Sequence, residues 1–248
     1  MRRSSPHLSS FSFGPGPLST AMKALIGANV VMFVTQLLVS PVTSLLGLQP
    51  DLVVSRLWLW QLGTYMFLHG GLFHILFNML ALWMLGTELE RIWGTRYFLK
   101  FYFVTGVGAG ALTVLFSLLP LAVFRQLYGV NVIGASGAIY GLLLAYALYF
   151  PDRPMFLFPI PFPIPAKIFA MIAGAIAFYA SVSGTGGGVA QATHLGGLIV
   201  AYLYLKKPRA TPLGELKYRY LRWKINRVRK KFDVYSGGRA DDWDRRIH

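Results

Sequence analysis

Three histidines and a serine stand in strongly apolar stretches of the sequence, where they could do chemistry: His69, His74, Ser136 and His194. Polar side chains are expensive in hydrocarbon, so the few that occur in such stretches are the most informative about function. A serine hydroxyl becomes a nucleophile when a neighbouring base takes its proton, and imidazole is the usual base. The pattern therefore predicts nucleophilic chemistry with Ser136 attacking and a histidine as its base.

The acidic residues of this part of the chain are badly placed to complete a three-residue relay. All of them fall in loops or at the ends of apolar stretches: Asp51, Glu88, Glu90 and Asp152. We therefore expect a two-residue dyad in which His194 serves Ser136. Taken alone, a membrane serine or histidine is often a packing residue, and we expect His69 to be structural.

Two further pairs of residues have helical spacing. Asn78 follows His74 by four residues, so the two side chains project from one face. They could donate to a developing oxyanion, together with backbone N–H groups near Ser136 at a helix N-terminus. Tyr140 follows Ser136 by four residues and shares its face.

The composition is that of an integral helical membrane protein. Of 248 residues, 55% are hydrophobic and 13% are charged, and the mean hydropathy is +0.52. A soluble domain has about 25% charged residues. There are no cysteines, which excludes disulfides, thiolate metal sites and a thiol nucleophile.

Three regions are predicted along the chain. Residues 1–21 form a Ser/Pro/Gly-rich disordered segment, 22–205 a catalytic domain with six spans, and 206–248 a basic tail. The apolar stretches of spanning length lie roughly at 22–40, 64–86, 98–119, 133–150, 165–183 and 189–205.

The histidines and the serine have similar predicted depths. His74 is about ten residues into the second span, Ser136 three into the fourth and His194 five into the sixth. These even-numbered spans run inward from the outer side, and a helix rises 1.5 Å per residue. All three groups therefore fall in the outer half of the membrane, which predicts one site that opens outward.

Lysine and arginine counts predict the orientation. Without the tail, eight basic residues fall on the side of the two termini and two on the opposite side. Both termini are therefore expected in the cytoplasm, most simply in a prokaryotic inner membrane. A transit peptide beginning at Arg2 and Arg3 is the alternative interpretation of the N-terminal segment.

The tail has fourteen Lys/Arg and five acidic residues. Its apolar residues recur at helical spacing among the basic ones: Leu221, Ile225, Val228 and Phe232. A basic amphipathic helix of this kind binds anionic lipid headgroups. The alternative is a solvated tail, and we do not expect a nucleic-acid partner.

At these residues the sequence resembles the rhomboid intramembrane serine proteases, over the segment from Trp60 to Ala201. Four motifs carry the resemblance: His69 to Asn78 with its terminal His-x-x-x-Asn, the Gly-x-Ser-Gly of Gly134 to Gly137, Ala192-Thr-His-Leu-Gly-Gly197, and Gly86-x-x-x-Glu90-x-x-x-Gly94. Two positions depart from the family pattern: Gln61 follows Trp60 where the family has arginine, and Thr95 stands where serine is common.

The resemblance implies a six-helix rhomboid-like bundle that cleaves transmembrane proteins near the outer part of the bilayer. It implies Ser136 as nucleophile, His194 as base, His74 and Asn78 as oxyanion donors, and support from Tyr140, Gly134 and Gly137. No metal or organic cofactor is implied.

Two other functions remain open. One is a non-proteolytic rhomboid-like protein that binds membrane clients, and the other is a small transporter with a histidine proton relay. Neither needs a nucleophile, so Ser136→Ala separates them from a protease. A zinc site is not expected because no His-Glu-x-x-His occurs.

Overall fold

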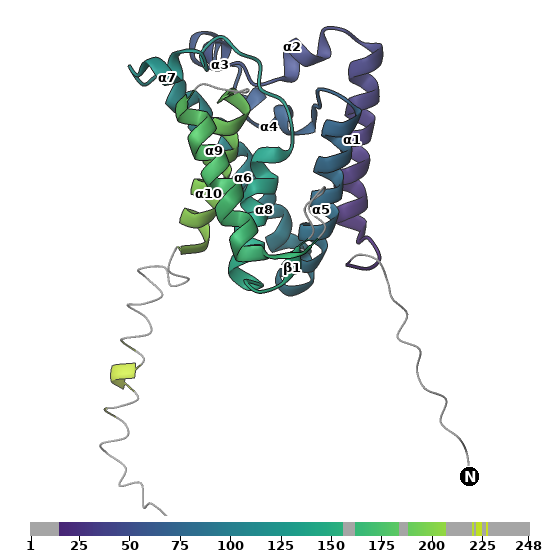
Figure 1. Ribbon diagram of the computed structural model, residues 1–248, viewed down its shortest axis with the longest axis vertical. Helices are drawn as coiled ribbons and strands as arrows, with labels where there is room; N and C mark the ends of the chain where they lie inside the picture. Colours follow the sequence, from purple (N-terminus) through teal and green to yellow (C-terminus); the bar gives the residue numbers. More distant parts are fainter. Residues whose placement is uncertain are drawn as a thin grey trace, which may run out of the picture. The chain divides into compact units, whose positions relative to one another are not determined.

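The computed structural model describes residues 15–155, 162–183, 188–206, 220, 222–224 and 227. The chain forms two compact units, Met1–Lys206 and Lys207–His248. The first unit is helical (Figure 1), and its elements are α1 (Thr20–Leu38), α2 (Val42–Leu46), α3 (Pro50–Arg56), α4 (Gln61–Thr64), the 3-10 helix η1 (Tyr65–Phe67), α5 (Leu72–Trp93), α6 (Thr95–Ser117), α7 (Ala122–Arg125), α8 (Ser136–Tyr149), β1 (Pro154–Met155), β2 (Ile164–Pro165), α9 (Ala166–Ser183) and α10 (Gly188–Lys206).

Long apolar helices dominate this unit. Among the described residues, four helices are long and apolar enough to cross a membrane, namely α1, α5, α6 and α9. The apolar helix α8 has 14 residues and α10 has 19. The prediction of an all-α, multi-pass integral membrane protein is confirmed, and these six helices are consistent with the six predicted spans.

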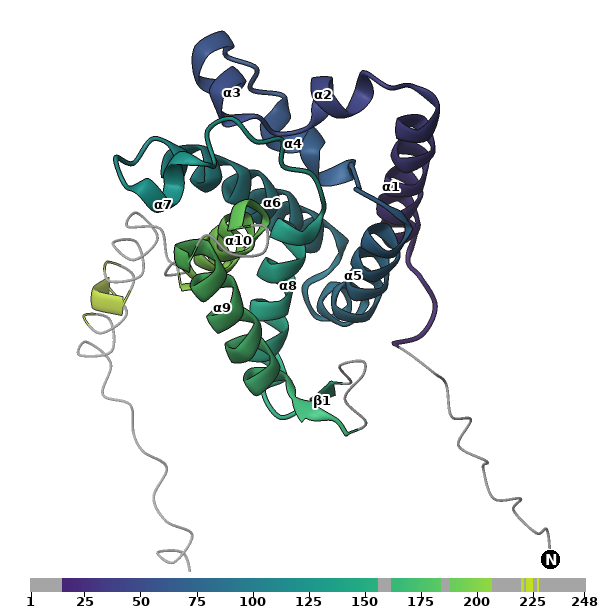
Figure 2. The same cartoon turned by 45° about the horizontal axis from the view of Figure 1, so that its top comes forward.

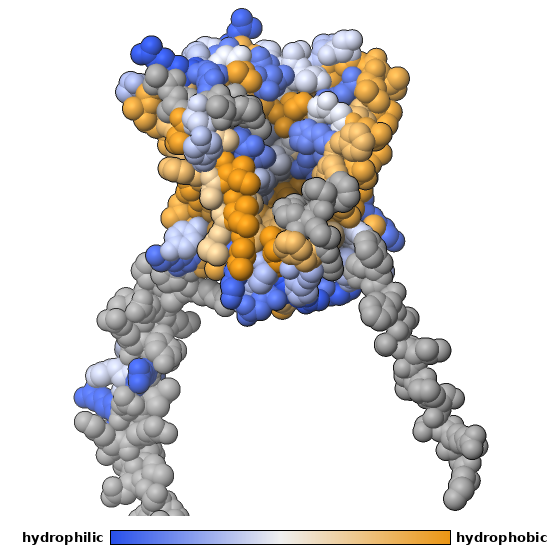
Figure 3. Space-filling view, viewed as in Figure 1, coloured by the Kyte–Doolittle hydropathy of each residue, from blue (hydrophilic) through white to orange (hydrophobic). Residues whose placement is uncertain are grey.

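The surface of the first unit suits a bilayer. On α1, Val31, Leu37 and Leu38 are 64%, 71% and 78% exposed. In Figure 3, hydrophobic residues dominate the middle of the visible face and hydrophilic residues gather at its upper and lower ends. Such a wide apolar belt would be unfavourable in water and is stable against lipid.

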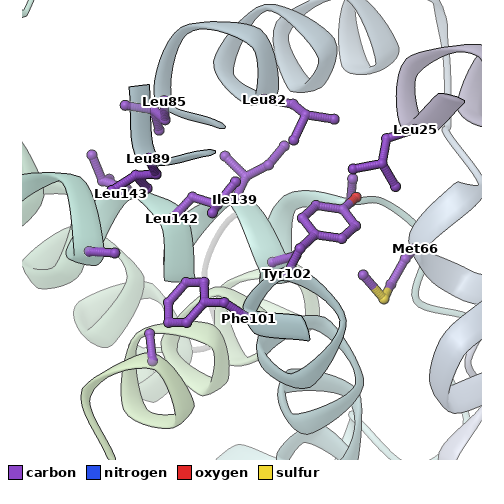
Figure 4. Packing of buried hydrophobic residues seen from close by; sticks show 14 of the residues in the cluster. Leu25, Met66, Leu82, Leu85, Leu89, Phe101, Tyr102, Ile139, Leu142 and Leu143 are labelled. Atoms are coloured by element: carbon purple, nitrogen blue, oxygen red, sulfur yellow. The ribbon is translucent and has the colours of Figure 1, made fainter. Parts of the chain in front are cut away.

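The helices that carry the candidate nucleophile and base occupy the middle of the bundle. Helix α10 packs against α6, α8 and α9, and α8 also contacts α5 (Figure 2). Helix α1 packs on α5. Helices α1 and α5 lie on one side of α8, and α10 lies on its other side (Figure 2). Large apolar side chains from α5, α6 and α8 fill the space between these helices, including Leu82, Leu85, Leu89, Phe101, Tyr102, Ile139, Leu142 and Leu143 (Figure 4).

Small residues let α8 and α10 approach closely. A Cβ atom on Gly197 would overlap the carbonyl oxygen of Gly137, so only glycine fits there. Thr113 and Thr193 add a hydroxyl–hydroxyl hydrogen bond of 2.9 Å between α6 and α10. In membranes, helix association depends on such close packing because lipid supplies little hydrophobic driving force between helices.

The second predicted span has the wrong boundaries. It was placed at 64–86, whereas the helix is Leu72–Trp93. The chain from Gln61 to Leu68 is also apolar, so hydropathy alone did not separate it from the span. In the structure this part forms α4 and η1, and the Gly70–Gly71 pair separates it from α5. His69 therefore lies before the helix, and His74 is its third residue.

The loop between α1 and α5 is anchored by a residue that departs from the family pattern. The side chain of Gln61 is fully buried. Its Oε1 accepts from the backbone N–H of Gln49 at 3.0 Å, and its Nε2 donates to the Leu45 carbonyl oxygen at 3.2 Å. The indole rings of Trp58 and Trp60 stack at 5.1 Å beside it. Glutamine thus fixes the loop through two backbone contacts.

Several predicted features fall outside the described residues. These are most of the N-terminal segment 1–21 and nearly all of the tail. In the second unit, the guanidinium carbon of Arg227 lies 5.1 Å from the centre of the Trp223 ring.

Candidate functional site

Ser136 is the first residue of α8, and the segment before it is held by backbone bonds. Val132 pairs with Leu48 in an isolated antiparallel bridge. The N–H of Gly134 donates to the carbonyl oxygen of Tyr65 at 2.9 Å. Gly134 has φ +128°, a conformation that side chains with a Cβ rarely adopt. These contacts direct the chain so that Ser136 begins the helix.

Ser136 and His194 lie in direct hydrogen-bond contact. The Oγ of Ser136 is 2.7 Å from Nε2 of His194. Fifty-eight residues separate them in sequence, and the close contact between α8 and α10 brings them together. Tyr140 stacks on the His194 ring, with centroids 4.1 Å apart and planes 7° from parallel. The ring is thus fixed on one face as well as at Nε2.

The second ring nitrogen of His194 also has a partner. Its Nδ1 lies 3.1 Å from Oε1 of Gln191, one turn earlier on α10. An amide oxygen can only accept, so this contact requires the proton on Nδ1. Nε2 then has a free lone pair toward the serine hydroxyl, which is the form a general base needs.

His74 is held in the opposite tautomer. Its Nδ1 accepts from the backbone N–H of Gly70 at 3.2 Å, which leaves the proton of the neutral ring on Nε2. A Cβ atom on Gly134 would lie 2.9 Å from that Nε2. The N–H edge of His74 therefore lies against the backbone two residues before Ser136, where it can act as a donor.

Asn78 is buried on α5, 7% exposed, and its amide holds the first turn of that helix. Its Nδ2 donates to the carbonyl oxygen of His74 at 2.7 Å. One of the two amide N–H groups is engaged in this bond. The side chain thus braces the backbone of His74, and a direct bond to a reacting atom stays a prediction.

His69 is a buried neighbour of the site, 2% exposed, and it precedes α5. Its ring centre lies 5.0 Å from that of His74, edge to face. Burial lowers the pKa of His69 to about 4, and the charge of nearby His74 lowers it further in the same direction. The residue is therefore neutral at physiological pH.

The structure brings together most of the residues expected from the sequence. His194 contacts both Ser136 and Tyr140, and His74 lies at the Gly134 backbone. Gln191 was missed, although its place three residues before a histidine on one helix face was a usable signal. Among the described residues, no group of three His, Asp or Glu side chains could hold a metal ion.

Comparisons with known proteins agree with this arrangement. Residues 56–207, more than half of the chain, match the family model described as the Rhomboid domain. The chain is 34% identical over 170 residues to the rhomboid protease GluP of Bacillus subtilis, a match covering 66% of this chain and 29% of that protein. It is 31% identical over 208 residues to the mitochondrial Rhomboid protein 1 of Saccharomyces cerevisiae, covering 80% of this chain and 56% of that one.

A third relative, the rhomboid protease AarA of Providencia stuartii, is 29% identical over 157 residues, or 58% of this chain and 54% of that protein. The chain thus spans less than two thirds of the length of these relatives. The family match includes the segments that carry His74, Ser136 and His194, the residues that the fold gathers at one end of α5, α8 and α10. The chain belongs to the rhomboid family of integral membrane proteins, to which these proteases also belong.

Proposed function

We propose that this chain is an intramembrane serine endopeptidase that cleaves transmembrane protein substrates with a Ser136–His194 dyad. The observation that carries the proposal is the 2.7 Å contact between Ser136 Oγ and His194 Nε2. A hydroxyl at that distance from an unprotonated imidazole nitrogen can transfer its proton as it attacks a carbonyl carbon.

The proposed reaction uses the tautomer of His194 in which Nε2 carries no proton. Ser136 Oγ bonds to the scissile carbonyl carbon while its proton passes to Nε2 of His194, giving a tetrahedral intermediate and an imidazolium. The intermediate collapses, the C–N bond breaks, and the imidazolium returns that proton to the leaving amine. Water then attacks the acyl-enzyme with His194 again as base, which releases the new carboxyl end and restores Ser136.

The negative charge on the former carbonyl oxygen needs donors that are already in place. The Nε2–H of His74 is one candidate, since Gly70 fixes its tautomer and Gly134 admits it next to the nucleophile. Backbone N–H groups in the first turn of α8 are others, because they have no partner within the helix. Asn78 assists by bracing His74. Such donors are usually worth several kcal/mol in the transition state.

The position of these groups along the helices supports cleavage near the outer side of the membrane. Ser136 is the first residue of α8, His74 the third of α5 and His194 the seventh of α10. At 1.5 Å per residue, all three lie within about 10 Å of their helix starts. Given the basic-residue bias, we place both termini in the cytoplasm and the site toward the outer face of a prokaryotic inner membrane.

We also propose that the basic tail rests on anionic lipid headgroups. The sequence pattern of Leu221 and Ile225 among lysines and arginines supports this, and both residues lie outside the described ones. The test is binding of the isolated tail peptide to anionic vesicles. Binding that is insensitive to salt would contradict an electrostatic attachment.

The proteolysis proposal is tested with the purified protein in liposomes that contain a transmembrane substrate. Wild type, Ser136→Ala and His194→Ala are compared by gel and mass spectrometry. Cleavage by wild type and by neither variant is the expected result, and the fragment masses give the cut position. A matched control is Ser117→Ala, because the buried Ser117 hydroxyl donates to the Val114 carbonyl of its own helix, α6. This control should cleave like wild type.

Two outcomes contradict the proposal. If Ser136→Ala cleaves as fast as wild type, the activity comes from elsewhere. If wild type cleaves none of several transmembrane substrates but binds them, the non-proteolytic client-binding function replaces the proposed one.

A further inference from the structure

The dyad lacks an acid, yet His194 still has a fixed partner on the nitrogen that faces away from the nucleophile. Among the described residues, the contact found at Nδ1 is Oε1 of Gln191, at 3.1 Å. The partner comes from one turn earlier on α10, so the same helix carries both groups. A neutral amide thus occupies the position that a carboxylate holds in a three-residue relay.

We propose that Gln191 is a positioning residue for the proteolytic reaction and that it sets the tautomer of His194. This inference rests on the proposed function. The amide oxygen keeps the proton on Nδ1 and leaves Nε2 ready to accept the proton of Ser136. With the other tautomer, Nε2 would present a hydrogen to the hydroxyl and could not act as a base.

A comparison of the two site histidines supports this role. At His74, a backbone N–H from Gly70 faces Nδ1, so the ring keeps its proton on Nε2 and can donate. At His194, an oxygen faces Nδ1, so the ring keeps its proton there and can accept at Nε2. The same side chain is thus prepared for two opposite tasks by the group that faces its Nδ1.

The amide also suits the surroundings. His194 becomes a cation in the middle of each step, and an oxygen dipole on Nδ1–H stabilises that cation. A neutral amide supplies this dipole without adding a formal charge to the bundle, and Gln191 is half-buried rather than enclosed. The rest of the ring is held by Tyr140, which stacks on its face and offers no acceptor to Nδ1. Among the residues that the structure describes, Gln191 therefore supplies the polar contact at Nδ1 of His194.

Two substitutions of nearly equal size test the proposal. Gln191→Met keeps the length of the side chain and removes the acceptor. Gln191→Glu keeps an acceptor. Both oxygens of an ionised carboxylate accept, so no rotation of this side chain can present a donor to Nδ1. Both are measured in liposomes for kcat and KM on a transmembrane substrate. In parallel, the rate at which a fluorophosphonate probe labels Ser136 is measured, which requires no peptide cleavage.

We expect Gln191→Met to lower kcat and the labelling rate about tenfold, the effect of losing one hydrogen bond at the base, with KM within about twofold. Gln191→Glu should recover most of both rates. Its acid limb of kcat/KM should move to higher pH, because a carboxylate favours the protonated imidazole. The titratable side chains that face His194, Tyr140 from α8 and His74 from α5, are the same in all variants.

Substitution of a residue on α10 that lies away from His194 should change neither rate. Tyr202→Phe removes an exposed hydroxyl from the far end of α10, and it should match wild type in both assays. If Gln191→Met reacts within about twofold of wild type, or if Gln191→Glu is as slow as Gln191→Met at every pH, the proposal is wrong. If wild type is labelled at Ser136 but cleaves no substrate, the proposed function fails and the labelling rates still test Gln191. If wild type is not labelled, both fail.

Discussion

Helices α8 and α10 are joined by direct contact of their backbones, whereas α1 is joined to the bundle through its side chains. Between α8 and α10, Gly197 lies directly on the Gly137 carbonyl. At one end of α1, the Ser19 hydroxyl donates to Glu90 at 2.6 Å. At the other end, Gln36 accepts from the backbone N–H of His69 at 2.9 Å. Between these ends α1 buries Leu25 and Asn29 on one face and exposes apolar side chains on the other.

The difference shows which part of the site tolerates change. The proposed nucleophile and base depend on a contact that has no room for even one methyl group. The region around His74 depends on hydrogen bonds within the first turn of α5 and on the segment that Gln36 holds. Substitutions at the first contact should displace reacting atoms, whereas those at the ends of α1 should mainly change stability.

The largest effect is expected at the donor side of the site. His74→Ala should lower kcat about 100- to 1,000-fold, since removal of one oxyanion donor typically costs this much. Because His74 lies outside the α8–α10 contact, thermal stability should change little. Steady-state cleavage in liposomes and a melting curve in detergent check both expectations. A variant with normal kcat would show that the oxyanion is held by backbone groups alone.

The next largest effect is expected at the contact between α8 and α10, which is compared with a substitution on α1. Gly197→Ala should push α10 from α8 and lower kcat about 100-fold, because a displacement near 1 Å at reacting groups has costs of this order. The melting temperature should fall as well. Gly27→Ala on α1 is the matched control, because among the described residues no atom beyond its own stretch of helix lies within 4 Å of the added Cβ. Equal behaviour of the two alanine variants would refute the proposed difference.

A smaller effect is expected where α1 meets α5 and α6. Glu90 is 7% exposed and accepts from the hydroxyls of Ser19 and Thr95, both at 2.6 Å. Glu90→Gln replaces one acceptor oxygen by a donor and should lower the free energy of unfolding by about 1–3 kcal/mol. The folded fraction should keep the wild-type kcat. Unfolding in a denaturant series measures the first quantity, and a drop in kcat would connect this end of the bundle to the chemistry.

The smallest effect is a dependence of stability on pH through His69. Its pKa is about 4 in the folded protein, because burial disfavours the charged ring, and about 6.5 when unfolded. The unfolded chain therefore binds more protons between these values, and stability falls as pH decreases through that window. From pH 7.5 to 6 the loss should stay under about 1 kcal/mol. His69→Phe removes this titration, so the pH dependence of its unfolding should be flatter than that of wild type. Identical pH dependence would show that His69 has the same pKa in the folded and the unfolded chain.

Much of the fold follows from hydropathy, and the main error has a clear cause. Five of the six predicted spans agree with helices to within about three residues at each end. The second failed because α4 and η1 are as apolar as the span beside them, and only the Gly70–Gly71 break separates them. Gln61 stands where the family has arginine. Its hydrogen bonds could not be foreseen from the sequence, because they are made to backbone groups of Gln49 and Leu45.

The sequence by itself determined the class of protein and the types of group at the candidate site. Apolar stretches of spanning length require helices in lipid, and the rarity of polar residues within them singles out Ser136, His74 and His194. Only the tertiary structure decided how those groups are used. Hydrogen-bond distance depends on glycine contacts between helices distant in sequence, and the tautomer of each histidine depends on whether Nδ1 faces the Gln191 oxygen or the Gly70 N–H. These are properties of geometry at the scale of an ångström, which residue types and spacing do not specify.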